Sequence, residues 1–123
     1  MDAILNSESA AKIPGFIAQA IYNAALDRVV VRGPGVDILH IWYGSLTLYK
    51  DVNLVSEEER YTGFEIEGVR NLYRHLNESF NQESVNVEKL LDALEQVLPG
   101  MAMEVQLSRL IYKSLGQPAV CLG

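Results

Sequence analysis

Residues 29–52 read VVVRGPGVDILHIWYGSLTLYKDV and combine β-forming residues, turn signals and the only tryptophan of the chain. Val29–Val31 is β-branched. The Gly-Pro-Gly sequence at Gly33–Gly35 then breaks the pattern, because neither a helix nor a central strand tolerates it. Gly44-Ser45 separates two further β-rich runs and is typical of a two-residue hairpin turn. The stretch therefore predicts an antiparallel meander.

A turn at Gly44-Ser45 determines which residues face each other across the hairpin. One face takes the pairs Tyr43 with Leu46, Ile41 with Leu48, and Leu39 with Lys50. The other face takes Trp42 with Thr47, His40 with Tyr49, and Ile38 with Asp51. Val29 and Val31, joined through the Gly-Pro-Gly turn, are expected on the His40/Trp42 face. Both faces then look apolar, so we expect the sheet to be covered on both sides, by helices or by a second copy of the chain.

Apolar residues recur at helical spacing in the segments before and after this stretch. Residues 14–27 predict an N-terminal helix, with Pro14 in its first turn. Three similar stripes predict C-terminal helices over residues 69–80, 87–98 and 101–115. Asn86 is the predicted N-cap of the second of these three helices.

The segment between Asp51 and Glu67 is acidic and admits two interpretations. Six acidic residues and one arginine give it a local charge of 1 − 6 = −5. Ser56–Glu59 matches a capping box, which favours a short helical turn followed by a fourth strand near Tyr61–Ile66. The alternative is one helix from Glu57 to Phe80. A solvated loop is the simplest role for the acidic residues, and a docking patch for a basic partner is the other.

Together these elements predict one α+β domain over residues 1–123. It has an N-terminal helix, a small antiparallel β-meander of three or four strands, and three C-terminal helices packed on the sheet. The net charge of −6, with lysine and arginine scattered along the chain, argues against nucleic-acid binding. The chain starts without a basic signal region, has no run near the roughly 18 apolar residues of a membrane span, and contains one cysteine. We therefore expect a cytoplasmic protein without a membrane partner.

No motif for catalysis, metal binding or phosphate binding stands out. The Gly-Pro-Gly turn lacks the third glycine and the Lys-Ser/Thr pair of a phosphate loop. Two histidines 35 residues apart and one cysteine do not have the spacing of a zinc site. We therefore expect no catalytic residues, no metal and no cofactor.

The His40/Trp42 face is the first candidate site. His40 lies opposite Tyr49 with Asp51 in diagonal reach, so it could act as an acid, a base or a pH-sensitive contact. The simpler interpretation is a packed histidine. Trp42 could offer a platform for a flat ligand or a partner side chain, unless this face belongs to the core. The candidates for ligand or partner binding are His40, Trp42, Thr47, Tyr49 and Asp51.

The last predicted helix is the second candidate site, because its apolar surface is wide enough to be buried between two partners. The interface candidates are Met101, Met103, Leu107, Leu110 and Ile111. We therefore expect a non-enzymatic interaction protein of the adaptor, regulator or chaperone-like kind, which binds itself as a homodimer and binds another protein. The alternative is a small-molecule-binding domain or small enzyme with a pocket at the His40/Trp42/Tyr49 face.

Overall fold

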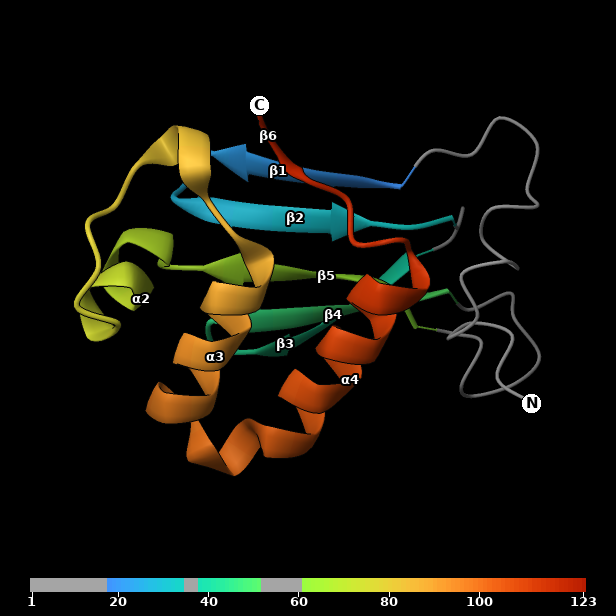
Figure 1. Cartoon of the computed structure of the whole chain (residues 1–123). Coiled ribbons are helices and arrows are strands. Elements are labelled where there is room, and N and C mark those ends of the chain that lie inside the picture. The colour runs from blue at the N-terminus through green and yellow to red at the C-terminus, as the bar shows by residue number, and fades with distance from the viewer. Residues whose placement is uncertain (1–17, 35–37, 52–60) are drawn as a thin grey trace.

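The computed structural model describes residues 18–34, 38–51 and 61–123. They form a mixed six-stranded sheet in the order β3-β4-β5-β2-β1-β6, and helices α3 and α4 lie across one face of it (Figure 1). The strands are β1 (Gln19–Asn23), β2 (Arg28–Arg32), β3 (Ile38–Tyr43), β4 (Leu46–Asp51), β5 (Tyr61–Glu67) and β6 (Val120–Leu122). The helices are α2 (Val69–His75), α3 (Val87–Val97) and α4 (Ala102–Ser114), with short 3-10 helices η2 (Gln82–Ser84) and η3 (Pro99–Met101).

The predicted N-terminal helix over residues 14–27 is wrong, because the described part of that segment contains a strand. β1 pairs antiparallel with β2 and parallel with β6, so that Ile21 lies opposite both Val30 and Cys121. The segment after β1 is a turn, in which the Asn23 side chain accepts a hydrogen bond from the Leu26 amide. The apolar spacing suits a helix, but β2 and the distant strand β6 pair with the two edges of β1, and such tertiary pairing overrides local propensity.

The predicted antiparallel meander of three or four strands is also wrong in its extent and connections. Its β3–β4 hairpin is confirmed with the predicted register, including His40 opposite Tyr49. However, β2 does not pair with β3; it lies between β1 and β5. β5 confirms the fourth strand predicted near Tyr61–Ile66 and excludes one helix from Glu57 to Phe80. The parallel pairing of β6 makes the sheet mixed.

The position of β5 decides which side chains form the core face of the sheet. Val29 and Val31 lie opposite Ile66 and Phe64, which in turn lie opposite Leu46 and Leu48. These six side chains are buried. Val29 and Val31 are therefore on the helix-covered face, and their predicted placement beside His40 and Trp42 is wrong. The opposite face carries charged residues such as Arg28 and Glu65, so the prediction of two apolar faces is wrong as well.

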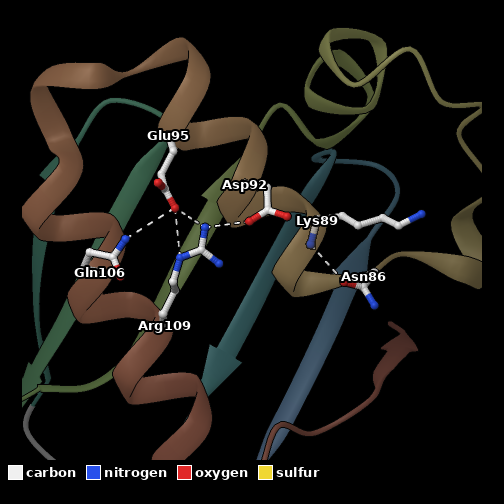
Figure 2. A network of polar contacts seen from close by, with 6 residues as sticks. All are labelled: Asn86, Lys89, Asp92, Glu95, Gln106 and Arg109. Carbon is white, nitrogen blue, oxygen red and sulfur yellow. Dashed lines mark hydrogen bonds and ion pairs between the residues drawn. The ribbon is translucent and has the colours of Figure 1, made fainter.

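The C-terminal helices agree with their periodicity, with one change in length. α2 ends at His75, five residues before the predicted end, because Asn77 adopts a left-handed backbone with φ 56°. α3 and α4 are confirmed to within about two residues at each end. The Asn86 side chain accepts a hydrogen bond from the Lys89 amide at 3.0 Å, as expected of an N-cap (Figure 2).

A polar network joins α3 to α4 and determines how α4 is rotated about its axis. The Arg109 guanidinium donates hydrogen bonds to Asp92, at 2.7 Å, and to Glu95 (Figure 2). The Gln106 amide approaches the same Glu95 oxygen at 3.5 Å. At 3.6 residues per turn, Met103 lies about a third of a turn around the helix from Arg109. The side of α4 that carries Met103 is therefore not the side that contacts α3.

Candidate functional site

A groove of about 550 Å³ opens between the first half of α4 and strands β4 and β5. Its lining is mainly apolar and consists of Leu48, Tyr61, Ala102, Met103, Glu104, Gln106, Leu107 and Leu110. Met103 is 83% exposed and Leu110 is also exposed, whereas Leu107 is partly buried against the core. We call this surface the α4 groove. Exposed apolar side chains grouped around a hollow are typical of binding surfaces.

A β-bulge brings Tyr61 into the α4 groove. The register between β4 and β5 shifts between Tyr49 and Lys50, so that Tyr61 lies opposite Lys50. Opposed residues share a face, and Tyr61 therefore joins Leu48 on the helix-covered side of the sheet. The Lys50 ammonium lies 5.3 Å from the centroid of the Tyr61 ring, within the range of a cation–π contact.

The floor of the α4 groove continues toward the sheet edge. Ile41 lies opposite Leu48 and Leu39 lies opposite Lys50, so both residues of β3 point to the same face as the groove. Leu39 is 50% exposed and Ile41 is half-buried. Within the part of the chain that the structure describes, β3 pairs with β4 alone. The apolar surface therefore ends at the edge of the sheet.

The predicted site around His40 lies on the opposite face of the same hairpin. The His40 and Tyr49 rings are stacked, with centroids 4.6 Å apart and planes 28° from parallel. Trp42 is 73% exposed beside them, while Thr47 and Asp51 are buried. The five predicted residues thus share one side of the hairpin, but only His40 and Trp42 are accessible.

Tyr49 takes part in a buried polar cluster that the sequence did not predict. Its hydroxyl donates to one oxygen of Glu65 at 2.7 Å, and the Arg28 guanidinium donates to the other at 2.9 Å. Burial, followed by the hydrogen bond to Glu65 and the charge of that carboxylate, raises the pKa of Tyr49 above its ordinary value. Both oxygens of Glu65 have donors from within the chain, so the cluster stabilises the sheet and offers no open position for proton transfer.

The predicted interface residues divide between the α4 groove and the core. Met103, Leu107 and Leu110 line the groove. Met101 lies half-buried in η3, and Ile111 is a core residue with 1% exposure. The two strand residues of the groove, Leu48 and Tyr61, were missed, because no local pattern reveals which strand lies beneath α4.

The described ranges contain no group of three or more histidine, cysteine, aspartate or glutamate side chains placed to hold a metal ion. Among the helices described, none is long and apolar enough to cross a membrane. Comparisons of the chain with known protein families, curated proteins and solved structures find no match. The evidence for function therefore lies in the geometry of the α4 groove and of the His40/Trp42 face.

Proposed function

We propose that this protein is a non-enzymatic interaction module whose α4 groove binds a short, basic amphipathic helix of another protein. The observation that carries the proposal is the apolar groove beside α4, with the largely exposed side chain of Met103 at its rim. The Arg109 network holds a different side of α4 against α3, so the chain's own helix pair leaves Met103 accessible.

The shape and charge of the groove favour this class of partner. From Met103 to Leu110 the wall spans about 10 Å, or two helical turns, which suits a partner helix with apolar residues at i, i+3 or i+4 and i+7. Glu104 is the charged residue in the lining, and the whole chain carries a net charge of −6. A basic partner would be attracted by this field and oriented by Glu104.

Two labelled model peptides with the same apolar helical face, one rich in lysine and one rich in glutamate, test the proposal by fluorescence anisotropy. We expect the lysine-rich peptide to bind more tightly and to lose affinity as salt is added. Met103→Lys should weaken its binding at least about tenfold, a change of about 1.4 kcal/mol. Leu26→Lys is the matched control, because it adds the same charge at an apolar residue that is 54% exposed in the β1–β2 turn.

Equal binding by the Met103→Lys and Leu26→Lys variants would rule out the α4 groove. Equal affinity for the two peptides would rule out a basic partner, because charge would then play no part in recognition.

A further inference from the structure

We infer that two copies of this chain associate through β3, whose outer edges pair antiparallel and join the two sheets into one. This contact goes beyond the proposed function and uses the backbone edge of β3, whereas the α4 groove is lined by residues of α4, β4 and β5. The pairing would produce a continuous sheet of twelve strands from two sheets of six, with the helices of both copies on the same side.

Within the residues that the structure describes, the β3 edge shows none of the features that usually keep sheet edges from pairing. Natural edge strands are protected by lysine, proline, bulges or short length. β3 has six residues, ILHIWY, and holds none of the lysine, arginine, aspartate or glutamate residues of the chain. Leu39 on one face and Trp42 on the other are 50% and 73% exposed. A strand added here would cover apolar surface on both faces.

The side chains of β3 complement those of a second β3. With Ile41 on the twofold axis, antiparallel pairing places His40 opposite Trp42 of the partner subunit, and the symmetric contact forms as well. His40 already stacks on Tyr49 at 4.6 Å. The indole of Trp42 of the partner subunit would extend this pair into a ladder of three rings on each side of the axis, and cross-strand aromatic pairs stabilise sheets.

Charge and area favour a second copy over an unrelated chain. Although each copy carries a net charge of −6, no ionised carboxylate lies on β3, so like charges do not meet within the strand pair. At 73% exposure, Trp42 offers roughly 180 Å², taking about 250 Å² for a whole tryptophan. With Leu39, His40 and the backbone edge, each copy would bury on the order of 500 Å². The total is near the minimum of roughly 1,000 Å² for a specific interface, so we expect a dimer with a Kd in the micromolar range.

Sedimentation equilibrium of the full chain, over concentrations from about 1 to 500 μM, tests this contact. We expect the mass to rise from 13.7 kDa toward twice that value. Trp42→Lys and Leu39→Lys should each weaken association at least tenfold. Leu26→Lys should associate like the natural chain, because it changes an equally exposed leucine outside β3. Far-UV circular dichroism confirms that each variant is folded.

Two results would overturn the inference. One is a monomer at every concentration; if the β3 amides that point away from β4 also resist hydrogen exchange, another segment of the same chain occupies the edge. The other is a dimer that persists in both β3 variants, since its interface must then lie elsewhere. Peptide binding separates the two proposals: a monomer that binds the lysine-rich peptide refutes the dimer alone, and a dimer that binds no peptide refutes the groove alone.

Discussion

Replacement of Tyr49 by phenylalanine isolates one hydrogen bond in the middle of the sheet. The substitution keeps the ring that stacks on His40 and removes the hydroxyl that donates to Glu65 at 2.7 Å. The carboxylate remains buried, and Arg28 still donates to its other oxygen. The variant therefore has one buried acceptor oxygen without a donor and no change in the shape of the core.

The expected cost follows from the charge of the acceptor. A hydrogen bond to an ionised group contributes about 1.5–3 kcal/mol, and one between neutral groups about 0.5–1.5 kcal/mol. Because Arg28 continues to stabilise Glu65, we expect Tyr49→Phe to lower the free energy of unfolding by about 2 kcal/mol. Urea unfolding followed by far-UV circular dichroism measures this loss. The control is Tyr112→Phe, which removes a 2.7 Å hydrogen bond to the neutral backbone oxygen of Pro118 and should cost about 1 kcal/mol.

The pH dependence gives this prediction a second, independent check. The pKa of Tyr49 is raised in the folded state by burial and by Glu65, so the unfolded chain loses this proton first as the pH rises above about 10. The stability that the neutral hydroxyl provides is fully present below that pH and declines above it. The cost of Tyr49→Phe should therefore shrink from pH 9 to pH 11. A cost no larger than that of Tyr112→Phe, or one that grows with pH, would refute the assigned role of Glu65.

Two further substitutions and one control variant test the packing of the sheet and the start of α3. Gly63→Ala should lower the free energy of unfolding by about 2–3 kcal/mol, because the new Cβ would lie 2.3 Å from the backbone oxygen of Val31. Gly100→Ala, where a Cβ would meet nothing within 4 Å, should change it by less than about 0.5 kcal/mol, and equal urea midpoints for the two variants would contradict this packing. Asn86→Ala should cost about 1 kcal/mol through loss of the cap on Lys89, measured by thermal unfolding; no shift in Tm would show that the cap contributes nothing.

The local elements could be predicted because their determinants lie within a few residues of one another. The Gly44-Ser45 turn specifies the β3–β4 register, since a two-residue loop leaves one antiparallel pairing. The apolar spacing and the Asn86 cap specify α3 in the same way. The stripe of Met103, Leu107 and Leu110 was likewise visible as one side of a helix.

The candidate site was only half predictable. The α4 wall of the groove follows from periodicity, but its floor depends on which strand lies beneath that helix. Tyr61 reaches the floor through a bulge that shifts the register by one residue, and such a shift moves a side chain to the other face. The buried Glu65 takes a hydrogen bond from Arg28, which is 37 residues earlier in the chain and lies on the adjacent strand.

The sequence by itself determined the hairpin, the helix pair α3–α4 and the apolar side of α4, since hydrogen bonds and spacing within each segment suffice for these. Only the tertiary structure decided that Gln19–Asn23 is a strand, that β5 separates β2 from β4, and that β6 forms the edge of the sheet next to β1. The physical reason is that a strand takes its hydrogen bonds from other segments. The partners of β1 are β2, which follows it closely, and β6, about 100 residues away, and no pattern within residues 19–23 records their presence.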